Sequence, residues 1–136
     1  MISKEDLQAQ IKFNLEKTEF SGLGDRYEGK VRDVYTSDEQ IILITSDRVS
    51  AFDRVLTTIP FKGQVLNQMA AFWFEATKDI VKNHVVDVPD PNVIVAKKVE
   101  IIPIEIVIRG YLTGSAWRDY SSGKAVSGVE LPSGMK

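Results

Sequence analysis

The sequence has 136 residues, 43% of them hydrophobic and 26% charged, which suits a folded domain with a real core and excludes a disordered chain. The formal net charge of −2 lacks the basic excess that general nucleic-acid binding requires, so no nucleic-acid partner is expected. The absence of cysteine excludes disulfides and thiolate metal sites, and a single histidine disfavours a Ser-His-Asp triad.

No apolar stretch approaches the roughly 18 residues that a membrane-spanning helix needs. The first ten residues are polar and lack the apolar core of a signal peptide. The sequence therefore predicts no membrane partner and a cytoplasmic location.

The first half of the chain predicts one helix followed by strands. Ser3 and Asp6 form a potential capping box, and the apolar residues that follow at four-residue spacing predict an amphipathic helix over 4–17. Residues 27–47 alternate around a polar turn and predict two strands. Residues 46–60 lack a clean period, which indicates a loop that enters another strand.

The second half predicts a long helix, two strands and a short helix. A one-face apolar stripe lies within 63–84 and predicts a helix near 63–82, with its aromatic residues packed in the core. β-branched residues predict strands over 93–100 and 103–109, and residues 113–122 predict a short helix. The fold class is α+β, with a mostly antiparallel sheet.

The stretch GKVRDVY is the first candidate ligand site. As a continuous strand it would present Lys30 and Arg32 on one face, and Gly29 would let the backbone approach a ligand closely. Two cations beside a glycine suit a polyphosphate. The alternative is an edge strand with solvated Lys and Arg, which the spacing alone favours.

The stretch SDRVSAFD is the second candidate. It concentrates Asp47, Arg48, Ser50 and Asp53 directly after a buried strand, which suits a polar ligand with several donors and acceptors. A turn held by an Arg–Asp pair explains the same residues equally well.

Two neighbouring lysines and three carboxylates are further candidate ligand-binding residues. Lys97 and Lys98 lie on opposite faces of a predicted strand, and an inward lysine needs an anionic partner, such as a nucleotide phosphate. A solvent-edge position for Lys97 is at least as consistent with the sequence. Glu28, Asp33 and Glu105 could bind a metal, but no paired spacing requires it.

The stretch IVIRGYLTGSAW ends a predicted strand at Arg109. Two glycines then permit tight turns, and Thr113 or Ser115 can cap the helix that follows. Free N–H groups at a helix start, together with Arg109 and a hydroxyl, favour a phosphate site. The alternative is plain helix capping beside a surface arginine.

Five ordered motifs in the chain are GKVRDVY, SDRVSAFD, FKGQVLNQMAAFWF, KNHVVD and PIEIVIRGYLTGSAW. Together they closely resemble the successive motifs of the SAICAR synthases (phosphoribosylaminoimidazole-succinocarboxamide synthases) of purine biosynthesis, over about residues 27–134. The resemblance implies a two-lobe fold similar to ATP-grasp and protein-kinase architectures. Residues 1–102 would form the β-rich lobe that covers ATP, and 103–136 the beginning of the second lobe.

The resemblance also implies an activity and a set of site residues. The family joins L-aspartate to the carboxylate of CAIR, a carboxyaminoimidazole ribonucleotide, using ATP and Mg²⁺ through a probable acyl phosphate. Lys30 and Asp47 would be the catalytic residues. The nucleotide would contact Gly29, Lys30, Val31, Arg32, Lys97, Ile102 and Ile104. CAIR would contact Asp47, Arg48, Ser50, Arg109, Gly114 and Ser115.

The chain departs from the family in one respect. Family members continue for roughly another hundred residues, which carry the metal-binding carboxylates. We therefore expect an N-terminal fragment that binds no metal, is inactive alone and exposes apolar surface that favours a homo-oligomer. A non-catalytic nucleotide-binding module is the alternative. A kinase-like phosphotransferase is disfavoured, because the G-x-G-x-x-G and H-R-D motifs are absent.

Overall fold

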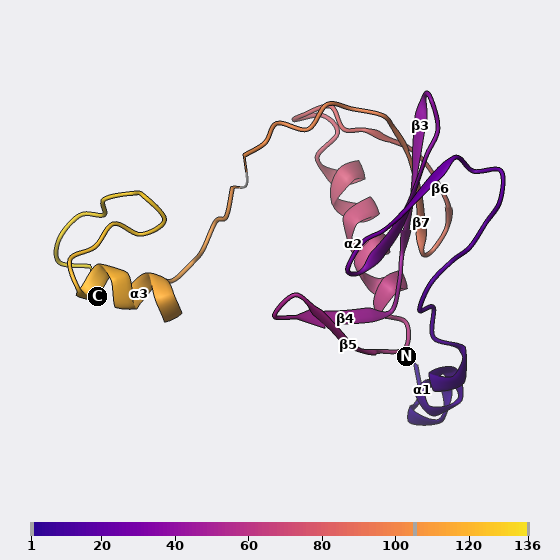
Figure 1. Ribbon diagram of the computed structural model, residues 1–136, viewed down its shortest axis with the longest axis horizontal. Helices are drawn as coiled ribbons and strands as arrows, with labels where there is room; N and C mark the ends of the chain where they lie inside the picture. Colours follow the sequence, from indigo (N-terminus) through magenta and orange to yellow (C-terminus); the bar gives the residue numbers. More distant parts are fainter. Residues whose placement is uncertain (1, 105, 136) are drawn as a thin grey trace. The chain divides into compact units, whose positions relative to one another are not determined.

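The computed structural model describes residues 2–104 and 106–135. Its contacts form two units, Met1–Glu100 and Ile101–Lys136. The first unit contains the sheets and two helices, and the second contains helix α3 (Gly114–Ser121) (Figure 1).

A five-stranded antiparallel sheet forms the framework of the first unit, with strand order β1-β2-β3-β7-β6. The strands are β1 (Asp25–Glu28), β2 (Arg32–Thr36), β3 (Gln40–Thr45), β6 (Val85–Asp90) and β7 (Val93–Lys97). Tyr35, Ile44, Ile94 and Ala96 are its buried hydrophobic residues. This confirms the predicted α+β class with a largely antiparallel sheet.

The chain reverses direction at Gly29–Val31, between β1 and β2. Glu28 pairs with Asp33 across the hairpin, and the Gly29 N–H donates to the Arg32 carbonyl at 2.8 Å. The prediction of a continuous strand with Lys30 and Arg32 on one face was therefore wrong. Gly29 permits the reversal, since even a bare Cβ there would lie 3.1 Å from the Arg32 carbonyl oxygen.

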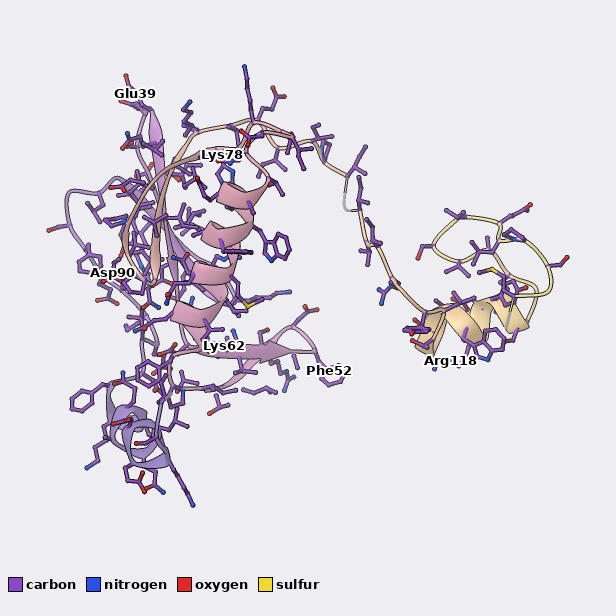
Figure 2. The ribbon with its side chains drawn as sticks, turned by 180° about the vertical axis from the view of Figure 1, so that it is seen from behind. Glu39, Phe52, Lys62, Lys78, Asp90 and Arg118 are labelled. Atoms are coloured by element: carbon purple, nitrogen blue, oxygen red, sulfur yellow. The ribbon has the colours of Figure 1, made fainter. Side chains whose placement is uncertain are left out.

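A two-stranded hairpin follows the sheet, formed by β4 (Arg48–Ala51) and β5 (Arg54–Thr58). The sequence indicated a loop before one strand, so β4 was missed. The turn residues Phe52 and Asp53 have φ of 51° and 62°, as in a type I′ turn, which usually carries Asn-Gly. Phe52 is 97% exposed and projects from the hairpin tip (Figure 2).

Helix α1 (Lys4–Gln10) has the predicted capping box, because Ser3 N–H donates to Asp6 at 3.0 Å and Asp6 N–H donates back to the Ser3 hydroxyl at 3.0 Å. The helix ends well before the predicted residue 17, after one further 3₁₀ turn (Ile11–Phe13). The next residues are held in non-helical form by buried side chains: the Leu15 N–H, for example, donates to Asp47 Oδ2 at 2.9 Å.

Helix α2 (Lys62–Ala76) lies against β3 and β7 (Figure 1). Its buried residues are Gly63 and Asn67, so small and polar groups face the sheet. The bulky residues of the predicted stripe face outward instead, and Phe72 and Trp73 are 64% and 60% exposed. Core packing for these two aromatics was therefore a wrong prediction, because the close approach of helix and sheet leaves no room for large side chains.

Two strand predictions also differ from the structure. Strand β6 was missed because Pro89 suggests an irregular segment, but β6 is an edge strand with register shifts, where proline is tolerated. Of the predicted strand over 103–109, the described residues 103–104 and 106–109 form none. A strand needs a paired neighbour, and Ile108 is exposed.

Helix α3 agrees with the helix predicted over 113–122, and Gly123 follows it with a φ of 73°. None of the helices formed by residues 2–104 and 106–135 combines the length and the hydropathy that a membrane span needs.

Candidate functional site

The turn Gly29–Val31 joins β1 to β2 and carries free donors. Within the part of the chain that the structure describes, the backbone N–H groups of Lys30 and Val31 have no acceptor. Successive N–H groups in a turn form concavities that bind anions. The turn thus offers two amide donors beside a lysine side chain.

The Lys30 ammonium pairs with Asp53 at the tip of the β4–β5 hairpin. The hydrogen bond to Asp53 raises the pKa of Lys30, and the same bond lowers the pKa of the Asp53 carboxyl. Both groups are therefore charged at neutral pH. Both side chains are largely exposed, so a stronger anion can compete with Asp53 for Lys30.

The guanidinium of Arg48 lies beneath the turn and is 3% exposed. Its Nη2 donates to the Gly29 carbonyl at 2.8 Å, and its Nε donates to the Lys30 carbonyl at 3.2 Å. Its Nη1 donates to the Glu16 carbonyl on the N-terminal segment. Arg48 therefore ties the turn to a segment that lies far from it in the sequence.

Asp33 is the carboxylate partner of Arg48, at 2.9 Å, and is 1% exposed. It also accepts from the backbone N–H and the hydroxyl of Thr18, at 2.6 and 2.9 Å. Burial alone would raise the pKa of Asp33, but the bonds from Thr18 and Arg48 outweigh burial and lower it. Asp33 is therefore an ionised, fully bonded core carboxylate.

Asp47, predicted as catalytic, is also buried. Its Oδ1 accepts from the Gly63 N–H at 2.8 Å and its Oδ2 from the Leu15 N–H at 2.9 Å, so it joins the start of α2 to the N-terminal segment. Ser50 is half-buried at the irregularity of β4. An Arg–Asp pair does exist, but Arg48 pairs with Asp33 rather than with a neighbour in the same stretch. The predicted CAIR contacts of Asp47, Arg48 and Ser50 and the catalytic role of Asp47 stay predictions.

The register of the sheet separates Lys97 from the turn. On β3, Gln40 pairs with Lys97 and Thr45 pairs with Arg32, so the two positions lie five residues apart along the strand. At about 3.4 Å per residue this is about 17 Å. Lys97 and Lys30 therefore lie toward opposite ends of the sheet, and one phosphate cannot bridge them.

Lys97 and Lys98 line different hollows. The hollow at Lys97 is lined mainly by residues after α2 and β7: Phe74, Thr77, Val81, Lys82, Asn83, His84 and Val99. The hollow at Lys98 is polar and is lined by Gly24, Asp25, Thr36, Ser37 and Asp38. The choice between the two lysines as the nucleotide contact stays open.

The remaining predicted residues belong to the second unit. Ile102, Ile104 and Arg109 are exposed and lie outside any strand or helix. Gly114 and Ser115 begin α3, as predicted, and Gly114 has a φ of 62°. Thr113 occupies the N-cap position but makes no side-chain capping bond. Residues 106–109, which were expected to end the strand that delivers Arg109, form no strand, so the phosphate role of these residues stays a prediction.

Within residues 2–104 and 106–135, the acidic residues form no group of three or more potential metal ligands. Glu28 pairs with Arg26 at 2.9 Å, and Asp33 is occupied as described. Glu105 lies outside the described residues. Because one or two carboxylates together with substrate phosphates can hold Mg²⁺, the expectation that the metal ligands lie elsewhere stays a prediction.

Sequence reasoning found Gly29, Lys30 and Arg48 but missed how they are connected. Asp33 was considered only as a metal ligand, and Asp53 only as one of several polar residues. The link between these residues depends on two hairpins meeting in space, and no local sequence signal records that contact.

Comparison with known proteins shows which family the chain matches. A family model described as SAICAR synthetase matches residues 25–136. The phosphoribosylaminoimidazole-succinocarboxamide synthase of Legionella pneumophila (strain Paris) is 50% identical over 118 residues, which cover 83% of this chain and 38% of that protein.

Two solved structures share the fold. The SAICAR-synthase from Saccharomyces cerevisiae complexed with SAICAR has a TM-score of 0.79 and 32% identity, covering 90% of this chain and 49% of that one. A type-2 SAICAR synthetase in complex with ADP has a TM-score of 0.64 and 26% identity, covering 79% and 46%. The chain thus spans less than half the length of these relatives. With the family model matched over residues 25–136, this chain belongs to the SAICAR synthetase family.

Proposed function

We propose that this chain supplies the nucleotide-binding part of an ATP-dependent ligase that joins L-aspartate to the carboxylate of CAIR, giving SAICAR, ADP and phosphate. The observation that carries the proposal is the Gly29–Val31 turn, which combines the Lys30 ammonium with two amide N–H groups that have no acceptor among the described residues. Membership of the SAICAR synthetase family supports the reaction, and the ADP complex of one relative supports the nucleotide.

The proposed chemistry begins with a carboxylate, which is a poor acyl donor to an amine. Attack of a CAIR carboxylate oxygen on the γ-phosphorus of ATP would break the bond to the bridging oxygen and release ADP. The aspartate amine would then attack the acyl phosphate, lose a proton and expel phosphate. Such transfers depend on alignment and on cations around the spreading negative charge. Lys30 and the turn amides would hold the phosphates in this chain.

The other predicted contacts divide between two ligands, the nucleotide and CAIR. Lys97 lies far from the turn along the sheet, which supports an adenosine contact, with Ile102 and Ile104 at the adenine. Arg109, Gly114 and Ser115 would hold the CAIR 5′-phosphate. Because Asp47 and Arg48 are buried and hydrogen-bonded to protein groups, Ser50 is the best placed of the three predicted CAIR contacts in that stretch.

Mg²⁺ remains part of the proposal for the whole reaction, where it would add positive charge beside the phosphates. We propose that the 136-residue chain has no turnover by itself and self-associates through exposed apolar side chains such as Phe72 and Trp73. The cytoplasmic location expected from the sequence is also part of the proposal.

A chimera tests the function directly. This chain would replace the matched residues of the Legionella pneumophila relative, to which it is 50% identical over 118 residues. The chimera should convert CAIR, ATP and aspartate to SAICAR, and Lys30→Met in the chimera should raise the KM for ATP. A folded chimera that binds ATP but makes no SAICAR would favour the alternative, a non-catalytic nucleotide-binding module.

A further inference from the structure

We propose that Arg48, together with Asp33, is a positioning residue that holds the Gly29–Val31 turn in the conformation that receives the nucleotide phosphates. The inference rests on the proposed function of the turn. It assigns Arg48 a role different from the CAIR contact that the family resemblance implies.

The bonding of Arg48 carries the inference. A guanidinium has five N–H donors, and four hydrogen bonds to protein groups use them here. Three go to the carbonyls of Gly29, Lys30 and Glu16, and the fourth goes to Asp33. The side chain is 3% exposed. A buried guanidinium with one donor left has little capacity for a ligand.

The geometry also explains how the hydrogen bonds from Arg48 to the turn affect phosphate binding. Arg48 fixes the carbonyls of the turn on the inner side, so the amide N–H groups of Lys30 and Val31 are directed away from those carbonyls. Preorganised donors bind an anion without the entropic cost of ordering the loop. Arg48 would therefore raise the affinity for phosphates without touching them.

Asp33 keeps Arg48 in place. It binds Nη2 of Arg48 with Oδ1, while Oδ2 accepts two bonds from Thr18 and one from Arg26 at 3.3 Å. The planar fork of Arg48 can serve several acceptors at fixed angles, whereas a lysine offers a single ammonium. A lysine keeps the positive charge but should therefore not hold the turn as Arg48 does.

The experiment uses the 136-residue chain with Arg48→Lys, and with Asp33→Asn as a second variant that keeps the side-chain size. Hydrogen exchange by NMR measures the Gly29 amide, which donates to Arg32, against the central-sheet amide of Ile44. Calorimetric titrations measure ATP and AMP. Arg54→Lys is the matched control, because Arg54 is exposed on the paired strand β5.

In Arg48→Lys we expect the Gly29 amide to exchange about tenfold faster, with Ile44 changed less than about twofold. ATP should bind about tenfold more weakly while AMP is unchanged. Asp33→Asn should shift both readouts in the same direction, and Arg54→Lys should shift neither.

Two results would overturn the inference. Gly29 exchange and ATP affinity that stay at wild-type values in both variants would show that Arg48 does not hold the turn. Equal acceleration of the Gly29 and Ile44 amides, with ATP and AMP weakened alike, would show a general structural role instead. A wild-type chain that binds ATP no better than AMP would overturn the proposed phosphate site itself, and the exchange data would still decide whether Arg48 fixes the turn.

Discussion

Replacing Gly63 by alanine separates helix propensity from packing. Gly63 lies in the first turn of α2, and alanine is favoured over glycine within a helix by about 1 kcal/mol. A Cβ at this position would lie 3.0 Å from the Ser46 carbonyl carbon, and closer still to the Thr45 carbonyl oxygen and the Asn92 amide nitrogen. Backbone would have to move, and such overpacking costs about 1–3 kcal/mol, or more at contacts this short.

The contact at Gly63 also involves two hydrogen bonds that a shift would disturb. The Gly63 N–H donates to Asp47 at 2.8 Å, and the Asn92 amide donates to the Thr45 carbonyl at 2.7 Å. Loss of a buried hydrogen bond costs about 1 kcal/mol. The steric and bonding costs together exceed the gain in propensity, so Gly63→Ala should destabilise the first unit by about 2–3 kcal/mol.

Urea unfolding of the 136-residue chain measures this change. Trp117 belongs to the second unit, so a Trp117→Phe background leaves Trp73 fluorescence as a probe of the first, alongside far-UV circular dichroism. Gln68→Ala, at an exposed position of the same helix, is the control and should change the free energy of unfolding by less than about 0.5 kcal/mol. Unchanged or increased stability in Gly63→Ala would refute the packing of α2 on the sheet.

Three further predictions concern other side chains. Phe52→Asn should stabilise the β4–β5 hairpin by about 1 kcal/mol in urea unfolding, because Phe52 has a φ of 51° and buries almost no surface; destabilisation would contradict this. Phe72→Ser should change the free energy of unfolding of the first unit at low protein concentration by less than about 0.5 kcal/mol, because the side chain is exposed; a loss above 2 kcal/mol would show that it packs in the core. The folded-state pKa of Asp33 is lowered, so its ionised form stabilises the wild type above about pH 4, and this contribution is lost as the pH falls through the folded-state pKa. The stability advantage of wild type over Asp33→Asn, measured by unfolding at several pH values, should shrink between about pH 5 and pH 2, and an advantage that grew would contradict the ion pair.

The fold class and the α1 capping box could be predicted, because both depend on local signals: β-branched alternation and the side chains of Ser3 and Asp6. The outward orientation of the apolar face of α2 could not be predicted. Its periodicity shows that one face is apolar, but Gly63 and Asn67 form the face that meets the sheet. Which face is buried depends on how closely the helix approaches, and that is a tertiary property.

The sequence predicted which residues occur at the candidate site but not which of them are bonded to one another. Lys30 beside Gly29 indicates an anion site on its own. The buried bond between Arg48 and Asp33 joins residues 15 positions apart on different strands, and the Lys30–Asp53 pair joins two hairpin turns. Alternation along residues 27–35 continues through the turn, so the sequence pattern did not reveal the reversal on which both contacts depend.

The most direct test of the account is calorimetric titration of the 136-residue chain with ATP and AMP, repeated for Lys30→Met. ATP should bind more tightly than AMP, since only ATP carries phosphates that reach the Gly29–Val31 turn, and Lys30→Met should reduce this preference without weakening AMP. Equal affinity for the two nucleotides in the wild type, or an ATP preference unaffected by Lys30→Met, would contradict a phosphate site at the turn.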